Sequence, residues 1–157
     1  MRKKIITSDQ EQNVDLCQNW LNIEKLAIVE VTSEDDAFPI ESALLTDKVS
    51  QWCASEPGKQ IIRLRFDDPQ RLQCIRLNFQ EPEVIRTQEF VLRWSNDDGQ
   101  SYQEIVRQQW NFNPEGSTSE IENYQVDLAG VTTIELSINP DINGGNAFAS
   151  LKELLLA

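Results

Sequence analysis

Apolar and polar residues alternate strictly in two consecutive stretches near the middle of the chain. The apolar members are Ile62, Leu64 and Phe66 in the first stretch, and Ile75, Leu77 and Phe79 in the second. A period of two is typical of β-strands, because successive side chains point to opposite faces. The polar segment 67–70, which contains a proline, separates the stretches. The pattern therefore predicts a β-hairpin whose turn lies at 67–70.

Shorter alternating segments occur before and after this region. They span 22–32, 89–95, 102–110, 122–128, 132–139 and 151–156. An Asp-Gly turn at 96–99 joins two of them, and little of the chain shows a helical period. Because a lone hairpin is marginal in water, these strands must bury one face against a second layer. We expect an all-β fold, a single antiparallel β-sandwich of the jelly-roll type, over 22–157, preceded by a lead-in at 1–21.

The phase of the alternation also predicts the core. Its expected members are Ile62, Leu64, Phe66, Ile75, Leu77, Phe90, Leu92, Trp94, Val126, Leu128, Ile134, Leu136 and Ile138. Trp52 precedes the first long strand and is expected to be buried as well. The first strand is expected to lie near the last.

Composition excludes several functional classes. The chain contains no histidine, which removes Ser-His-Asp and Cys-His pairs and the commonest zinc ligand. No nucleophile–base pair or metal-ligand cluster is visible, so we predict that the chain is not an enzyme and uses no cofactor. Glu120 and Glu122, beside Tyr124, are expected to be a solvated strand edge rather than a hydrolytic pair.

Charge and apolar content bear on partners and location. The formal net charge of −12 disfavours nucleic acid and anionic membranes. No apolar run reaches the roughly 18 residues of a membrane span, and the start of the chain lacks the apolar region of a secretory signal. The three cysteines are widely spaced, as reduced thiols would be. A cytoplasmic protein is therefore expected.

Several short motifs occur in a characteristic order. They are 43–47 followed by Ser50-Gln51-Trp52, then 90–95, Asp98-Gly99 before Tyr102, and the closing segment 149–154. This order resembles the discoidin or coagulation factor 5/8 type C module, within the galactose-binding-domain-like β-sandwiches. The resemblance implies a jelly-roll sandwich that binds a glycan or a small polar ligand through loops at one rim.

One loop departs from that family. Carbohydrate-binding members hold calcium in an Asp-Gly-Asp-x-x-Thr loop before the tryptophan. Here Leu45 stands at the first aspartate, and Lys48 adds a positive charge. Calcium takes about six to eight oxygen ligands, so no metal is predicted. The same segment also resembles the N-terminal module of an animal DNA single-strand-break repair scaffold, which would imply a cytosolic protein–protein interaction domain.

The loops 38–50, 80–88 and 110–119 are expected to meet at one rim. Their candidate ligand-binding residues are Asp47, Arg86, Trp110, Phe112 and Asn113. Arg86 can present a planar fork of donors, and Trp110 an apolar face, which suits a polar ring or an acidic peptide. In the alternative interpretation, Trp110 and Phe112 plug the end of the sandwich.

Three arginines, Arg63, Arg65 and Arg76, share the outward face of the central strands. They can form surface ion pairs, for example with Glu135, or make a patch for an anion or an acidic partner. Two functional hypotheses remain. The chain is a non-catalytic binding module for a carbohydrate, or it is a protein–protein interaction domain.

Overall fold

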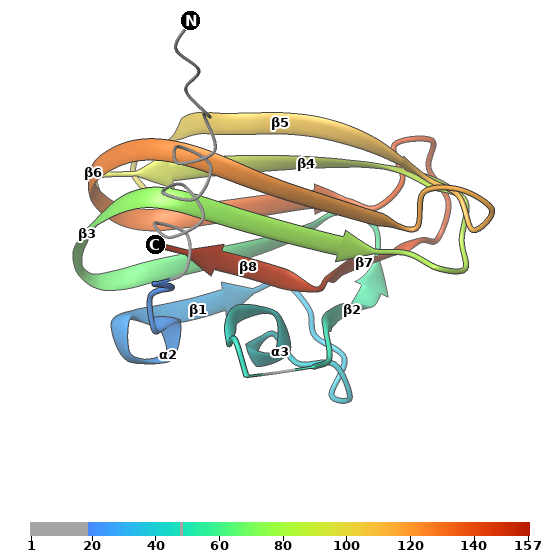
Figure 1. Cartoon of the computed structure of the whole chain (residues 1–157), viewed down its shortest axis with the longest axis horizontal. Coiled ribbons are helices and arrows are strands. Elements are labelled where there is room, and N and C mark those ends of the chain that lie inside the picture. Colours follow the sequence, from blue (N-terminus) through green and yellow to red (C-terminus); the bar gives the residue numbers. More distant parts are fainter. Residues whose placement is uncertain (1–18, 48) are drawn as a thin grey trace, which may run out of the picture.

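The computed structural model describes residues 19–47 and 49–157, in which antiparallel strands form a β-sandwich (Figure 1). In chain order the elements are α2 (Ile23–Leu26), β1 (Ala27–Val31), α3 (Glu41–Leu44), β2 (Trp52–Pro57), β3 (Gln60–Gln80), β4 (Arg86–Ser95), β5 (Gln103–Phe112), β6 (Ser119–Asn139), β7 (Phe148–Leu151) and β8 (Glu153–Leu156). The predicted all-β antiparallel sandwich is confirmed. The expected lead-in at 1–21 lies mostly outside the described residues.

Two long strands, β3 and β6, run through both layers of the sandwich. Each is 21 residues long, and the two pair with each other over almost their whole length. Both curve at the same end of the molecule (Figure 1). The first half of β3 and the second half of β6 belong to the sheet ordered β1-β3-β6-β4-β5, whereas the other halves of β3 and β6 lie in the opposite layer beside β8.

The predicted hairpin at 67–70 is wrong, because this segment belongs to the continuous strand β3. The chain does reverse here, but each half of β3 pairs with β6 instead of with the other half. The register of that pairing shifts between Arg65 and Cys74, where the two strands bend together. A strand that switches sheets at a corner keeps one buried face in each layer. Alternation therefore survives on both sides of a bend, as it does on both sides of a turn.

The core lies between the two layers, largely as the alternation predicts. Ten of the expected core residues are buried, and three, Trp94, Val126 and Leu128, are partly buried and pack against them. Trp52 is fully buried, as predicted, and its indole Nε1 donates to the Ser33 carbonyl oxygen at 3.1 Å. Phe79 and Phe90 stack across the two layers with ring centroids 5.3 Å apart.

The first predicted strand, 22–32, is shorter than expected. Residues 23–26 form one helical turn, α2, and only 27–31 form β1, which pairs with the first half of β3. The Leu21 N–H donates to the Leu156 carbonyl oxygen at 2.7 Å. The start of the described chain is therefore attached to the end of β8.

Candidate functional site

Two of the five predicted ligand-binding residues, Arg86 and Phe112, are enclosed in the fold. The guanidinium of Arg86 donates from Nε to Glu81 at 2.8 Å and from Nη1 to the Pro140 carbonyl oxygen at 2.9 Å. Its Cζ also lies 4.7 Å from the centroid of the buried Phe112 ring. A buried charge requires such partners. Arg86 and Phe112 therefore close the end of the sandwich, and in this structure neither side chain is presented to a ligand.

The sequence does carry a signal for this arrangement. Arg86 and Gln88 continue the inward phase of Phe90 and Leu92 along β4, and all four side chains are buried. A charged residue in an inward phase is easily assigned to the neighbouring loop, because buried arginines are rare.

Trp110 and Asn113 lie near the same end, on β5 and on the connection to β6. Trp110 is half-buried, packs against the core and has an enclosed indole nitrogen. This agrees with the alternative in which it plugs the end of the sandwich. Asn113 is exposed, and its Oδ1 accepts the Glu115 N–H at 3.0 Å. It stabilises its own turn.

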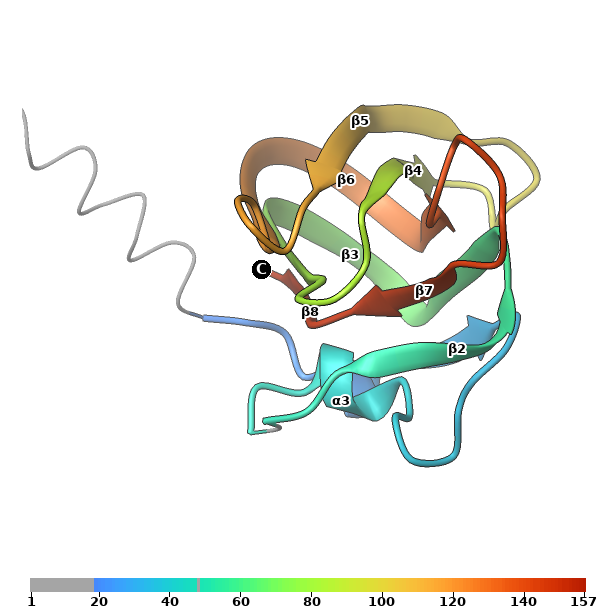
Figure 2. The ribbon, with the colours of Figure 1, turned by 90° about the vertical axis from the view of Figure 1, so that its right-hand side faces the viewer.

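Asp47 lies apart from the other predicted residues. Its loop is beside α3, away from the connections 81–85 and 113–118 in both views (Figures 1 and 2). It lines a hollow of about 560 Å³ together with Trp20, Leu21, Asn22, Glu24, Leu44, Leu45 and Thr46. The hollow thus combines an indole with carboxylate, amide and hydroxyl groups. Trp20 was missed by sequence reasoning, because the residues before it carry no clear period.

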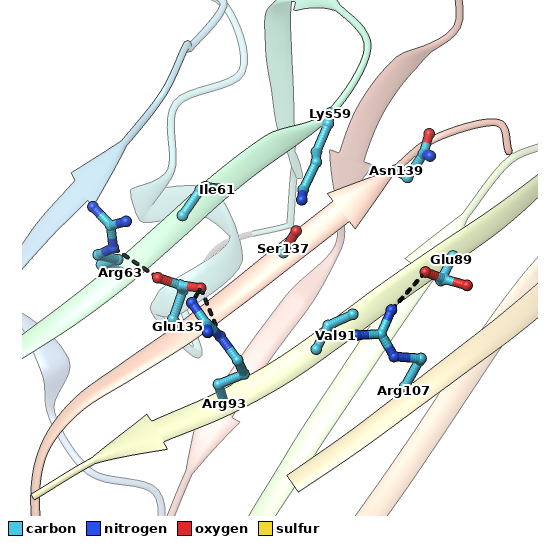
Figure 3. A pocket seen from close by; sticks show the side chains of 10 residues that line it. All are labelled: Lys59, Ile61, Arg63, Glu89, Val91, Arg93, Arg107, Glu135, Ser137 and Asn139. Atoms are coloured by element: carbon cyan, nitrogen blue, oxygen red, sulfur yellow. Dashed lines mark hydrogen bonds and ion pairs between the residues drawn. The ribbon is translucent and has the colours of Figure 1, made fainter. Parts of the chain in front are cut away.

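A second hollow, the sheet basin, lies on the outer face of the sheet ordered β1-β3-β6-β4-β5 and has a volume of about 300 Å³. On one side of it, Glu135 accepts Arg63 Nε at 2.9 Å and Arg93 Nε at 3.0 Å (Figure 3). On the other side, Arg107 Nη1 donates to Glu89 at 3.0 Å. The ion pair expected between Arg63 and Glu135 is therefore present, and the same carboxylate also pairs with Arg93.

Opposing effects act on the Glu135 carboxyl, whose side chain is 3% exposed. Burial alone would raise its pKa, but the hydrogen bonds from Arg63 and Arg93 outweigh burial and hold the pKa below its ordinary value. The remaining predicted outward arginines are also paired. Arg65 Nη1 lies 3.5 Å from Glu30 Oε1, and Arg76 Nε lies 3.5 Å from Glu153 Oε1.

Glu120 and Glu122 form part of a polar cluster between β5 and β6. Gln108 Nε2 donates to Glu120 at 3.0 Å and also to Glu122, while the Tyr124 hydroxyl donates to Gln108 Oε1 at 3.1 Å. Glu120 is 1% exposed, so the expected solvated edge is wrong at this residue. Burial, and then the Glu122 carboxylate, raise the pKa of Glu120 from 4.5 to about 7. The cluster joins the edges of the two layers.

Within the described ranges, no group of three or more Cys, Asp or Glu side chains is placed to hold a metal ion. In the sequence comparison with discoidin-like modules, the loop at 45–50 stands where carbohydrate-binding members hold calcium. Asp47 in this loop is exposed. None of the helices in the described residues is long and apolar enough to cross a membrane.

Several solved structures of carbohydrate-binding modules have a similar arrangement of strands. The CBM32-3 module of a family 31 glycoside hydrolase from Clostridium perfringens matches with a TM-score of 0.64 and 17% identity, over 99% of this chain and 98% of that one. The family 32 module of NanJ from the same organism, in complex with galactose, matches with a TM-score of 0.59 and 15% identity, over 87% of this chain and 96% of that one.

A third module, CBM32-5 from Clostridium perfringens in complex with GalNAc-β-1,3-galactose, matches with a TM-score of 0.60 and 18% identity, over 88% of this chain and 99% of that one. The chain has the galactose-binding-domain-like β-sandwich fold. The predicted resemblance is therefore confirmed as a shared fold. No family sequence model matches the chain, and no curated protein sequence matches it.

Proposed function

We propose that this galactose-binding-like sandwich is a non-catalytic carbohydrate-binding module. The observation that carries the proposal is the shared fold, which extends over nearly the whole of modules whose structures contain galactose or GalNAc-β-1,3-galactose. Because function resides in sites and not in folds, the proposal also needs a surface on this chain that suits a sugar.

The hollow beside α3 has the chemistry of a sugar site. Sugar rings present apolar C–H faces that pack on an aromatic ring, and hydroxyl groups that need donors and acceptors. The hollow provides the indole of Trp20, the amide of Asn22 and the carboxylate of Asp47. We assign the sugar to this hollow. Of the predicted rim residues, Asp47 alone belongs to it.

Two substitutions in the hollow test this assignment. Trp20→Ala should weaken binding of a sugar selected on a glycan array by about ten-fold or more, as truncating a central aromatic contact does. Asp47→Asn should also weaken binding, because it removes a charged acceptor. Isothermal titration measures both. Asn113→Ala is the matched control, because Asn113 is exposed at the separate rim.

The outcomes separate the alternatives. If Asn113→Ala abolishes binding and the two hollow variants do not, the sugar binds at the rim and the assignment to the hollow fails. If no glycan binds and a cellular protein is captured instead, the chain is an interaction domain, as in the alternative hypothesis.

A further inference from the structure

The sheet basin is positively charged, although the chain is strongly acidic. Its ten lining residues contain four basic side chains, Lys59, Arg63, Arg93 and Arg107, and two acidic ones, Glu89 and Glu135. The lining therefore has a formal charge of +2, against −12 for the chain. A local concentration of one charge in a concave surface focuses the field there.

This positive charge is not neutralised evenly. Arg107 is bonded to two carboxylates, those of Glu89 and Glu104. In contrast, Arg63 and Arg93 share the single carboxylate of Glu135. Lys59 is exposed and forms no salt bridge with any described residue. Its ammonium group points along the basin toward Ser137 (Figure 3). The unpaired charge is therefore concentrated at the Lys59 end.

The floor of the basin is suited to a ring and not only to an ion. Ile61, Ser137 and Val91 stand in one row across three neighbouring strands, because Ser137 is the partner of both other residues in the β-sheet register. All three side chains are at least half-buried. The row offers two apolar side chains with a hydroxyl between them, bordered by cations.

We propose that the sheet basin binds a carboxylated sugar ring, a uronic acid residue of an oligosaccharide. The carboxylate lies beside Lys59, and the ring covers Ile61 and Val91. A free inorganic anion would use the cations and leave this floor empty. A neutral sugar would make no use of the positive charge of Lys59. The site lies on the outer face of the sheet and is separate from the hollow beside α3, so it goes beyond the proposed function.

The test uses trigalacturonic acid as probe and the full chain labelled with ¹⁵N. Titration should shift the backbone amide signals of Ile61, Val91 and Ser137 saturably, while galactotriose, its neutral counterpart, should not shift them. Lys59→Ala should weaken trigalacturonate binding by about five-fold, the effect of one partly exposed charge pair. Binding should also weaken as NaCl screens the interaction.

Lys25→Ala is the matched control, because it removes the same charge from an exposed position on α2. It should leave the affinity unchanged within two-fold, as expected for a distant charge screened by salt. The proposal is overturned if trigalacturonate produces no saturable shifts, or if the two lysine variants weaken binding equally. It is also overturned if a glutamate-rich peptide shifts these amides and trigalacturonate does not. The binding of neutral sugars by the Trp20→Ala variant tests the hollow beside α3 and does not affect the outcome for the sheet basin.

Discussion

Single residues in this protein show how burial decides what a charged group does. Arg86 and Glu135 are both enclosed, and each is compensated by opposite charges and hydrogen bonds. Glu120 is enclosed beside a second carboxylate, and none of the salt bridges between described residues includes it. Its charged form is therefore the one that the folded protein disfavours.

The Glu120 carboxyl makes stability depend on pH. Its pKa is about 7 in the folded protein against 4.5 ordinarily, so the folded state binds a proton between these values and the unfolded state does not. This site therefore stabilises the fold at low pH, and its contribution falls as pH rises from about 4.5 to 7. Glutamine cannot ionise, so Glu120→Gln should remove this fall in stability with rising pH. At pH 8 it should raise the free energy of unfolding by on the order of 2 kcal/mol.

Urea unfolding at pH 5 and pH 8 measures the effect of Glu120→Gln. The variant should differ from the wild-type chain more at pH 8 than at pH 5. Glu115→Gln, at an exposed loop position, should show no such difference. An equal effect of Glu120→Gln at both pH values would contradict the assignment of the raised pKa to this residue.

At the scale of elements, the bend shared by β3 and β6 organises the sandwich. In β6 the bend contains Gly130, whose φ is +68°. Residues with a side chain are disfavoured in this conformation because Cβ approaches the following carbonyl oxygen. A β-carbon at Gly130 would meet nothing else within 4 Å, so backbone strain alone decides the effect of a substitution.

Gly130→Ala should therefore destabilise the protein by about 1–2 kcal/mol. Gly116 provides a matched control, because a β-carbon there also meets nothing and its φ is not in the left-handed region. Gly116→Ala should be neutral within about 0.5 kcal/mol. Equilibrium denaturation of both variants makes the comparison. Equal stability of the two would show that the bend tolerates a side chain.

At the scale of the whole molecule, the two layers share their central strands. One half of β3 and one half of β6 lie in each layer. Neither layer can therefore lose its central strands while the other layer stays folded. Leu64 and Leu77, both fully buried, lie in the two different halves of β3. They report on the two layers separately.

Leu64→Ala and Leu77→Ala should each lower the stability of one common transition by about 2–5 kcal/mol. Tryptophan fluorescence and far-UV circular dichroism should give coincident unfolding curves for both variants. Gln73→Ala, on an exposed side chain of the same strand, should change little. Separate transitions for the two probes would mean that the layers unfold independently.

Features of the fold that depend on neighbouring residues could be predicted from the sequence, whereas features that depend on distant residues could not. Strand phase depends on neighbouring residues, so the inward set from Ile62 to Ile138 could be predicted well. The partners of the two halves of β3 lie about 40 to 80 positions away along the chain, from Ser119 paired with Gln80 to Ile138 paired with Gln60, so a bend was predicted as a hairpin turn. The resemblance at 43–52 and 90–102 identified the fold because those motifs mark its strand order.

The candidate sites depend even more on distant contacts. The sequence by itself determined the sandwich, most of its core and the absence of histidine chemistry. Tertiary structure decided that Arg86 and Phe112 close the end of the sandwich, that Asp47 joins Trp20, and that Glu135 joins Arg63 to Arg93. Alternation shows only which face of a strand is buried, whereas a site forms where several faces and loops meet in space.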